Sequence, residues 1–291
     1  MIKRSLGDKI FDTCNYGILI LLTIVTLYPF LFVLFASLST PSELVKQTGI
    51  LWKPMGFYLE GYKLVLKNPM IGIGYKNTLI YVLLGTILNV FFTALFAFVL
   101  SRKDLYWKKY MMMMIVFTMF FSGGLIPEYM LVKNLGMLDT RWSLIVPGLI
   151  ATWNLIIMRT SFQSIPYELE EAAKMDGASD WTVFSKVILP LSVPLLAVMV
   201  LFYGVAHWNA WASALIYLRD RDLFPLQLVL REILIQNSTS DTTNLSSASD
   251  PFLGEVVKYA TIIVATLPIL VMYPIIQKHF TKGVMIGALK G

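Results

Sequence analysis

The chain has 291 residues, of which 57% are hydrophobic and 14% are charged, well below the roughly 25% of charged residues usual in soluble domains. A mean hydropathy of +0.68 over this length excludes a single soluble core and predicts several membrane spans. The formal net charge of +6 comes from 24 basic residues scattered through short segments, which favours a role in membrane orientation over nucleic-acid binding. The single cysteine, Cys14, excludes an intrachain disulfide and has no cysteine or histidine nearby to complete a metal site.

Six apolar runs are spread along the chain, and each is close to the 17–25 residues that cross about 30 Å of hydrocarbon as a helix. We therefore predict an all-α membrane protein with six transmembrane helices. The first run is too long for a cleavable signal peptide and lacks a small-residue cleavage site, so we expect it to be retained as a span. The runs cover residues 16–36, 79–100, 110–126, 142–158, 187–210 and 256–276.

The third run contains helix breakers, Ser122-Gly123-Gly124 and Pro127. Breakers at membrane depth are tolerated where the backbone faces protein or a water-filled path. This block therefore either contributes to a translocation path, with Gly123 and Gly124 as candidates, or only marks the end of a helix.

The distribution of lysine and arginine predicts the orientation. With the N-terminus inside, the four cytoplasmic segments hold 13 basic residues in 67 positions, and the outer segments hold 10 in 102. This excess favours cytoplasmic N- and C-termini, and it places residues 159–186 and the tail 277–291 in the cytoplasm.

Two outer segments are long. Residues 37–78 contain several proline, glycine and aromatic residues, and we expect them to fold against the membrane surface. Residues 236–251 have 12 of 16 positions occupied by serine, threonine, asparagine or aspartate. Such a composition buries almost nothing, so we predict a mobile loop there.

The most informative stretch, residues 166–194, is a polar helix–turn–helix between two long apolar runs. Pro166 suits the first turn of a helix, and Gly177 supplies a C-terminal stop. Ser179 or Asp180 can cap the helix that follows. The stretch carries five acidic residues: Glu168, Glu170, Glu171, Asp176 and Asp180.

One face of the first helix is small and nearly apolar, because Leu169, Ala172, Ala173 and Asp176 fall at i, i+3, i+4 and i+7. Small side chains let another surface approach the backbone closely, so this helix either docks on a soluble partner or anchors two spans at the interface. The carboxylates share their face with a lysine and have no histidine nearby. This favours a solvated helix face over acid–base catalysis.

The spacing of Glu171-Ala172-Ala173, Asp176-Gly177-Ala178 and Ile188-Leu189-Pro190 resembles the EAA loop of permease subunits of bacterial ABC importers. The likeness extends over most of the chain and is similar to the carbohydrate-uptake branch that contains the smaller permease subunit of the maltose importer. The block 121–127 looks more like a relative in Gram-positive bacteria associated with uptake of plant-polysaccharide oligosaccharides. Further matching segments are Asn77-Thr78-Leu79, residues 97–102, residues 135–140, Trp208-Asn209, residues 280–283 and residues 287–291.

This resemblance implies a type I ABC importer permease fold with a cytoplasmic coupling helix. Residues 1–71 would hold the N-terminal tail, the first span and an outer loop. Residues 72–291 would form a core of five spans with the coupling loop at 159–186. By resemblance, the ATPase-coupling residues are Glu171, Ala172, Ala173, Asp176, Gly177 and Ala178, and the ATPase-contacting residues of the tail are Lys282, Gly283, Gly287 and Lys290.

The resemblance also implies partners: a homologous second permease, a dimer of ABC ATPases and an extracellular solute-binding lipoprotein, with an oligosaccharide as substrate in the bacterial cell membrane. The sequence has no Gly-x-x-x-x-Gly-Lys-Ser/Thr phosphate loop. We therefore expect no catalytic residue, cofactor or metal in this chain, with ATP and Mg used by the partner ATPase.

Two alternative functions are a permease for an amino acid or peptide, or a stand-alone secondary transporter. Secondary transport would normally need ionisable residues in mid-span, where this chain has almost none.

Several polar and aromatic residues inside or at the ends of spans are candidates for a sugar path. Asn89, Asn154 and His207 either line this path or form hydrogen bonds between helices. Trp153 beside Asn154 is a candidate pair because aromatic faces suit sugar rings. Trp208 and Asn209, at the predicted outer end of the fifth span, are either an outer gate or ordinary membrane anchors.

Overall fold

The computed structural model describes the backbone of residues 6–243 and 253–288, and the side chains of residues 7–235 and 254–271. Every regular element in these ranges is helical, as the sequence predicts. The chain divides into two compact units. One comprises residues 1–69 and 230–267, and the other comprises residues 70–229 and 268–291.

The first unit holds α1 (Leu6–Leu38), α2 (Pro41–Lys46), α3 (Glu60–Lys67) and parts of α15 (Leu226–Thr243) and α16 (Leu253–Ala288). Its contacts include the ring of Phe32 edge-on to Tyr259, with 5.8 Å between the centroids. The Tyr28 hydroxyl accepts a hydrogen bond from the backbone N–H of Leu51 at 3.2 Å. The most apolar stretch of α1 is not buried at all within the described structure. An apolar helix with no protein cover is suited to contact with lipid or with another membrane helix.

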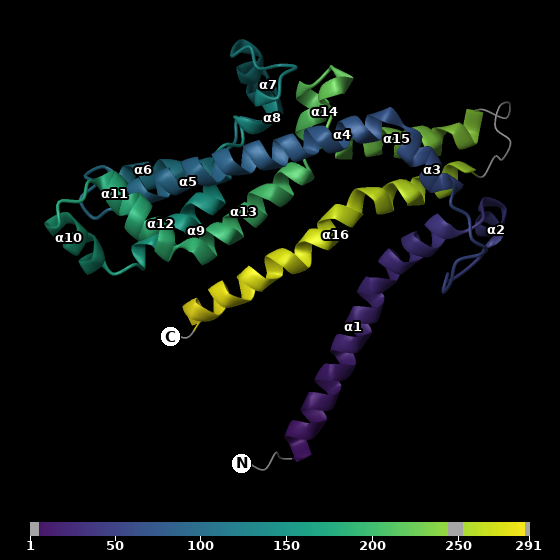
Figure 1. Cartoon of the computed structure of the whole chain (residues 1–291), viewed down its shortest axis with the longest axis horizontal. Coiled ribbons are helices and arrows are strands. Elements are labelled where there is room, and N and C mark those ends of the chain that lie inside the picture. The colour runs from purple at the N-terminus through teal and green to yellow at the C-terminus, as the bar shows by residue number, and fades with distance from the viewer. Residues whose placement is uncertain (1–5, 244–252, 289–291) are drawn as a thin grey trace. The chain divides into compact units, whose positions relative to one another are not determined.

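The second unit is built on a 33-residue helical rod of α4 (Pro69–Ile80), the π-helical turn η1 (Tyr81–Gly85) and α5 (Thr86–Ser101). Figure 1 shows α5 beside α9 (Thr152–Gln163) and α13 (Val193–Trp208), and these helices contact one another. Their buried core contains small and large apolar residues, including Ala94, Ala97, Phe98, Met158 and Met199.

The remaining elements of this unit are short. They are α6 (Lys108–Phe120), α7 (Leu125–Asn134), α8 (Trp142–Ile145), α10 (Tyr167–Met175), α11 (Asp180–Val183), the π-helical turn η2 (Phe184–Ile188), α12 (Leu189–Leu191), α14 (Ala212–Tyr217) and the 3-10 turn η3 (Arg221–Leu223).

Within the described residues, three helices are long and apolar enough to cross a membrane: Gly7–Leu38, Pro69–Ser101 and Gly254–Val271. Two bent pairs raise the number to five if each pair is one crossing. The helices α6 and α7 meet at 115°, and the segment Asp180–Leu191 meets α13 at 83°. The residues of the third and fifth predicted spans therefore lie in bent pairs of helices and not in single straight helices. For the fifth, the bend follows Pro190 and lies at Ser192, one residue before α13.

The fourth predicted span, 142–158, is wrong as a continuous helix. The chain forms the single turn α8, leaves helical geometry over residues 146–151 and resumes as α9. Pro147 and Gly148 lie in this interruption, where proline removes a hydrogen-bond donor and glycine weakens a helix.

The predicted polar loop 236–251 begins later than expected, because α15 continues to Thr243. Residues 244–252 lie outside the described structure, so the predicted mobility remains a prediction.

The structure gives a physical role to three residues of the segments that resemble sugar permeases. The Asn77 amide donates to the carbonyls of Asp222 at 2.7 Å and Phe224 at 3.1 Å, and the Thr78 hydroxyl accepts from the N–H of Leu226 at 2.8 Å. Asp139, with φ of 58°, accepts from the N–H groups of residues 219 and 220, both at 2.8 Å. These two donors lower the pKa of the Asp139 carboxyl. Together the contacts fix the segment that leads from α14 into α15.

Candidate functional site

The helix α10 forms where local sequence signals predict it. Pro166 is its N-cap, so the helix begins at Tyr167. Glu168 and Glu170 lie in its first turn, where the positive end of the helix dipole favours carboxylates.

Gly177 ends this helix as predicted. Its φ is +80°. Its N–H donates to the carbonyl of Lys174 at 3.0 Å, and the N–H of Ala178 donates to the carbonyl of Ala173 at 2.9 Å. This pair of bonds is the Schellman pattern, which needs a residue in the left-handed region at the position of the glycine. Ser179 then caps α11 by accepting from the N–H of Thr182 at 3.3 Å. The turn between α10 and α11 is therefore fixed by its own backbone bonds.

The sequence predicts a small, nearly apolar face and a face of solvated carboxylates on α10, and the structure differs from this prediction at two residues. Ala173 is partly buried and packs against the core cluster, so it does not belong to the exposed small face. Glu170 is 4% exposed, so it is not one of the solvated carboxylates. The face that remains exposed holds apolar as well as charged side chains: Leu169, Glu171, Ala172, Met175 and Asp176.

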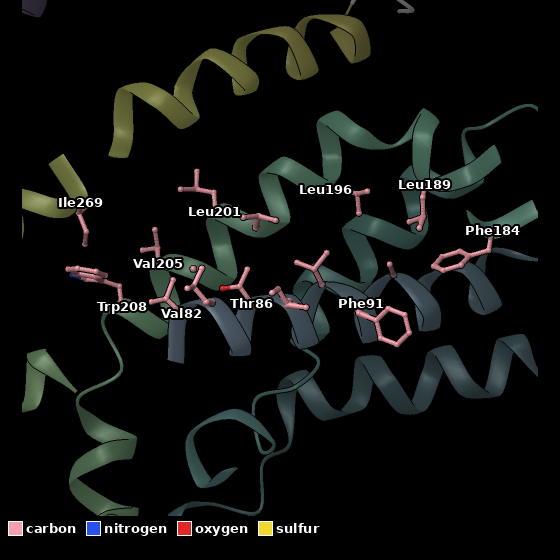
Figure 2. A pocket seen from close by; sticks show the side chains of 16 residues that line it. Val82, Thr86, Phe91, Phe184, Leu189, Leu196, Leu201, Val205, Trp208 and Ile269 are labelled. Atoms are coloured by element: carbon pink, nitrogen blue, oxygen red, sulfur yellow. The ribbon is translucent and has the colours of Figure 1, made fainter. Parts of the chain in front are cut away.

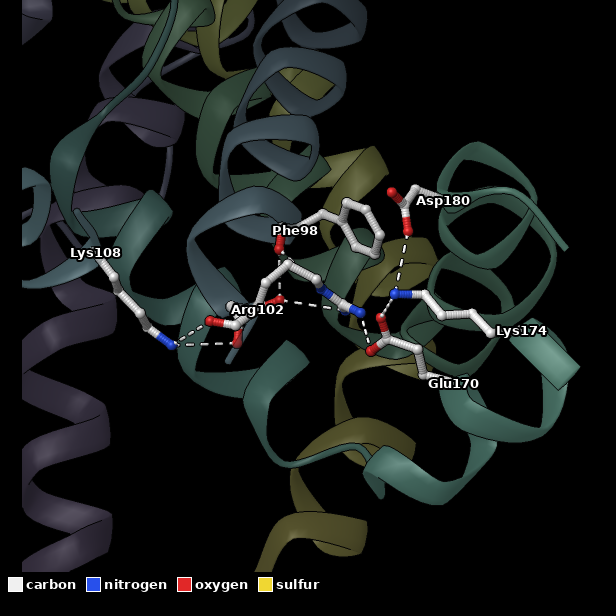
Figure 3. Close-up of polar contacts among 7 residues, drawn as sticks. Phe98, Arg102, Lys108, Glu170, Lys174 and Asp180 are labelled. Carbon is white, nitrogen blue, oxygen red and sulfur yellow. Dashed lines mark hydrogen bonds and ion pairs between the residues drawn. The ribbon is translucent and has the colours of Figure 1, made fainter. Parts of the chain in front are cut away.

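Glu170 is buried against the C-terminal end of α5, where its Oε2 forms an ion pair with the guanidinium of Arg102 (Figure 3). Its Oε1 lies 3.2 Å from the Nζ of Lys174, which also lies 3.3 Å from the carboxylate of Asp180. We call Arg102, Glu170, Lys174 and Asp180 the clasp. It joins three elements, since Arg102 follows α5, the next two residues belong to α10, and Asp180 begins α11.

Arg102 is held from the side of α5 as well. Its guanidinium carbon lies 4.0 Å from the centroid of the Phe98 ring, a favourable cation–π position. Burial lowers the pKa of the Arg102 guanidinium, and the negative charges of Asp104 and Asp180 act in the opposite direction. The guanidinium stays charged nonetheless, because arginine is too strong a base to lose its proton in proteins.

Cations also cap the last carbonyl groups of α5. The Nζ of Lys108 donates to the carbonyls of Ser101 at 3.3 Å and Arg102 at 2.8 Å. The Nε of Arg159 donates to the carbonyl of Leu100 at 3.2 Å. The end of a helix leaves carbonyls without partners and carries partial negative charge. These two cations therefore stabilise the end of α5 that carries Arg102.

Sequence reasoning missed the special position of Glu170. Three glutamates lie within four residues, and nothing local distinguishes the buried one. The available signal was Arg102, a cation placed directly after a long apolar run. A charge at the rim of a span needs a partner, but the sequence does not say which carboxylate supplies it.

The interruption at residues 146–151 is held by polar side chains from other helices. The Asn89 amide donates to the carbonyls of Gly148 at 2.6 Å and Leu149 at 3.1 Å. The Nε2 of His207 lies 3.0 Å from the Oδ1 of Asn89. The Tyr203 hydroxyl accepts from the N–H of Ala151 at 3.0 Å. Non-helical backbone at membrane depth needs such partners. Asn89 and His207 thus hydrogen-bond between helices, which was one of the two predicted roles.

The candidates for the sugar path are separated by the structure. Trp153 is 62% exposed, whereas Asn154 beside it is buried, so they do not act as a pair on one surface. Gly123 and Gly124 are exposed in the bend between α6 and α7, and Gly124 has φ of +85°. The hydroxyls of Thr118 on α6 and Thr152 on α9 lie 3.4 Å apart. The broken third and fourth predicted spans therefore meet near Trp153.

Trp208 and Asn209 are also separated. Trp208 is buried and lies edge-on to Tyr75, with 6.5 Å between the ring centroids. Asn209 is exposed, and its amide donates to the carbonyl of Val205 at 3.0 Å. The buried indole of Trp208 is part of the packed interior and not an exposed interfacial anchor.

A pocket of about 530 Å³ lies along η1, α5 and α13 (Figure 2). Trp208, Val82 and Thr86 stand at the end nearest Ile269, and Phe184 and Leu189 stand at the other. Its polar lining is confined to the Thr86 hydroxyl and the Trp208 indole; the other lining side chains are apolar or glycine. A sugar presents many hydroxyls that need partners when they leave water, so this pocket is not suited to sugar.

The predicted tail residues can be placed only in part. Lys282, Gly283 and Gly287 belong to the helical backbone of α16, and Lys290 lies outside the described residues. Among the described residues, no group of three or more histidine, cysteine, aspartate or glutamate side chains is placed to hold a metal ion.

Comparisons with known proteins agree with one another. The family description "Binding-protein-dependent transport system inner membrane component" matches residues 72–286. The polygalacturonan/rhamnogalacturonan transport system permease protein YtcP of Bacillus subtilis (strain 168) is 42% identical, over 98% of this chain and 99% of its own length. The protein LplC of the same organism is 40% identical, over 98% of this chain and 96% of its own length.

A solved structure resembles the chain over nearly its whole length. It is a crystal structure of a bacterial ABC transporter involved in the import of the acidic polysaccharide alginate. Its matching chain is 29% identical, with a TM-score of 0.86, and the match covers 96% of this chain and all of that one. Since the family description covers most of the chain and the relatives match it end to end, the chain belongs to the family of inner membrane components of binding-protein-dependent transport systems.

Proposed function

We propose that this protein is the permease subunit of an ATP-driven importer that carries oligosaccharides, specifically carboxylate-bearing ones, across the bacterial cell membrane. The likeness to a permease for polygalacturonan and rhamnogalacturonan supports this substrate class, as does the likeness to an importer of acidic alginate. The main structural support for the proposal is α10. This short helix is held to the rest of the chain by the ion pair of Glu170 on one face, and its other face is exposed.

The exposed face of α10 is suited to bind an ATPase subunit. Met175 is 88% exposed and Leu169 is 45% exposed, and exposed apolar groups beside charged ones are typical of protein interfaces. Glu171, Ala172, Asp176 and Gly177 complete the surface that we assign to coupling. Ala173 and Ala178 support it from the inward side, where both pack against the core cluster.

The full assembly that we propose contains this chain, a homologous second permease, two ATPase subunits and an extracellular solute-binding protein. ATP and Mg bind to the ATPase subunits, in line with the missing phosphate loop here. Both termini and α10 face the cytoplasm. Six crossings arise if each bent pair is one crossing and the segment from α8 to α9 is another, broken one. The polar groups of its interruption are satisfied by Asn89 and Tyr203.

Partner dependence tests this proposal. The chain expressed alone should insert into membranes and transport nothing. The complete complex in proteoliposomes should take up a labelled oligogalacturonide only when ATP and the loaded binding protein are present. A neutral maltohexaose of equal length serves as the substrate control. ATP-independent uptake by the single chain would contradict the importer, and equal uptake of both sugars would contradict the preference for acidic substrates.

We assign Trp153 to the sugar path, because its ring is exposed at the start of α9, next to Thr152, whose hydroxyl lies 3.4 Å from that of Thr118 near the end of α6. Replacing Trp153 with alanine should lower the uptake rate by about tenfold, which corresponds to roughly 1.4 kcal/mol. Trp153→Phe keeps an aromatic face and should retain at least a third of the rate. Uptake rates of purified complexes in proteoliposomes would measure both effects. Equal rates for the alanine variant and the unmodified complex would remove Trp153 from the path.

A further inference from the structure

We propose that Glu170 and Arg102 are positioning residues that fasten α10 to the cytoplasmic end of α5, so that these two helices move as one body during transport. This inference rests on the proposed function, since it concerns how force on α10 reaches the spans. Glu170 and Arg102 act through the helices that they join and not by contact with substrate or nucleotide.

Glu170 is buried, and Arg102 is largely buried. The side chain of Glu170 is 6% exposed and that of Arg102 is 14% exposed. A buried charge that loses its partner is strongly unfavourable, so the pair stays formed whenever α10 is folded against α5. By contrast, the pairs Lys46–Glu43 and Lys63–Glu60 elsewhere in the chain have all four side chains at least 48% exposed. Exposed pairs of that kind contribute little.

The two ends that the pair connects are each held rigidly. On the side of α5, the final carbonyls are capped by Lys108 and Arg159, and Arg102 rests on the ring of Phe98. On the side of α10, Lys174 joins Glu170 to Asp180 at the start of α11. Phe184 follows in η2, with its ring centroid 5.1 Å from that of Phe98. The ion pair therefore links two elements that are each already fixed.

The free face of α10 is directed away from the pair. Glu170 and the partly buried Ala173 point inward, while Leu169 and Met175 remain exposed. A partner that pushes or pulls on the exposed face must move α10 as a body. Within the clasp, the most buried link from α10 to a long span is the ion pair with Arg102 (Figure 3).

A crosslink tests joint motion directly. The Nζ of Lys103 lies 4.4 Å from the ring centroid of Tyr167, so cysteines at these positions lie across the junction of α5 and α10. In a complete complex that carries Cys14→Ser, the variants Lys103→Cys and Tyr167→Cys would be joined with a short bifunctional thiol reagent. If the helices move as one body, the crosslinked complex retains at least half of the ATP-driven uptake of the same complex before crosslinking. Loss of uptake on crosslinking, with each single-cysteine variant active after the same treatment, would overturn the proposal.

Charge removal tests the role of the pair itself. Glu170→Gln should lower the sugar taken up per ATP hydrolysed at least tenfold, and Arg102→Gln should do the same. Arg102→Lys, which keeps the charge, should retain at least a third. Asp104→Asn is the matched control, because Asp104 is an exposed carboxylate two residues from Arg102, and it should stay within twofold.

The double variant Arg102→Gln/Glu170→Gln separates a pair from two independent residues. If the two charges serve each other, the double variant falls no further than either single variant, because no unpaired charge remains buried. The assignment would be overturned if the loss of sugar uptake per ATP in the double variant equalled the product of the two single losses. It would also be overturned if Glu170→Gln took up as much sugar per ATP as the unmodified complex. All ratios refer to the unmodified complex. If that complex imports another solute and no oligosaccharide, the proposed function is wrong, and the clasp is judged by crosslinking and by the variant ratios measured with that solute.

Discussion

Replacing Gly85 with alanine is expected to destabilise the protein strongly, although the change adds only one methyl group. A Cβ at Gly85 would lie 2.4 Å from the Nε2 of His207 and 2.7 Å from its Cε1, well inside van der Waals contact. His207 cannot move without giving up its bond to Asn89, which in turn holds the carbonyls of Gly148 and Leu149. One methyl group would thus disturb the packing of η1 on α13 and the broken segment before α9.

The size of this effect follows from two contributions. Overpacking of a filled core costs about 1–3 kcal/mol, and a buried polar group left without its partner costs about 1–3 kcal/mol more. For a chain of this size a loss of about 3 kcal/mol lowers the melting temperature by roughly 6–12 °C. Thermal unfolding of the purified complex, followed by tryptophan fluorescence, would measure it.

Gly204→Ala is the matched control, since Gly204 lies on α13 close to the same rod. A Cβ there would meet the Thr86 hydroxyl at 3.7 Å and Val82 at 4.0 Å, which are ordinary contacts. Alanine is also a better helix former than glycine by about 1 kcal/mol. We therefore expect Gly204→Ala to melt at or above the temperature of the unmodified complex. If Gly85→Ala has the same melting temperature as Gly204→Ala, the close packing of η1 against His207 is wrong.

The sequence predicts an element of this structure well where the residues that determine the element are its neighbours in the chain. The helix α10 and its turn follow from neighbours in the chain: Pro166 before the helix, Gly177 after it and Ser179 at the next N-cap. The long apolar helices follow equally from continuous apolar runs, although the helix of the second predicted span starts at Pro69 and not at residue 79. Local chemistry is sufficient in these places.

The errors occur where a partner lies far away in the sequence. Apolar composition alone suggested one helix over 142–158, yet the chain can leave helical geometry there because Asn89 and Tyr203 supply the missing hydrogen bonds. Likewise, the acidic stretch suggested solvated carboxylates, and Glu170 became the exception because Arg102, 68 positions earlier, meets it. Neither partner can be assigned from hydropathy or helix periodicity, since both depend on tertiary packing.

Replacing Gly177 with leucine is expected to abolish coupled transport while membrane insertion remains normal. Gly177 has φ of +80°, and a Cβ there would meet nothing within 4 Å. The effect must therefore come from the backbone and not from a clash within the chain. A non-glycine residue in the left-handed region costs about 1–2 kcal/mol, which favours unwinding of the Schellman turn and release of the carbonyls of Ala173 and Lys174. A displaced turn would misdirect the exposed face of α10.

Gly177→Asn distinguishes this explanation from a steric one at the ATPase. Asparagine tolerates positive φ far better than leucine but has a side chain of similar size. If the backbone conformation decides, Gly177→Asn keeps at least a third of the uptake and Gly177→Leu loses more than nine-tenths, with both present in the membrane in equal amounts. If close approach of the ATPase decides, both variants lose uptake together, and reduced copurification of the ATPase would show it. Full transport by Gly177→Leu would contradict both, and it would leave the loop as an anchor between two spans with no part in coupling.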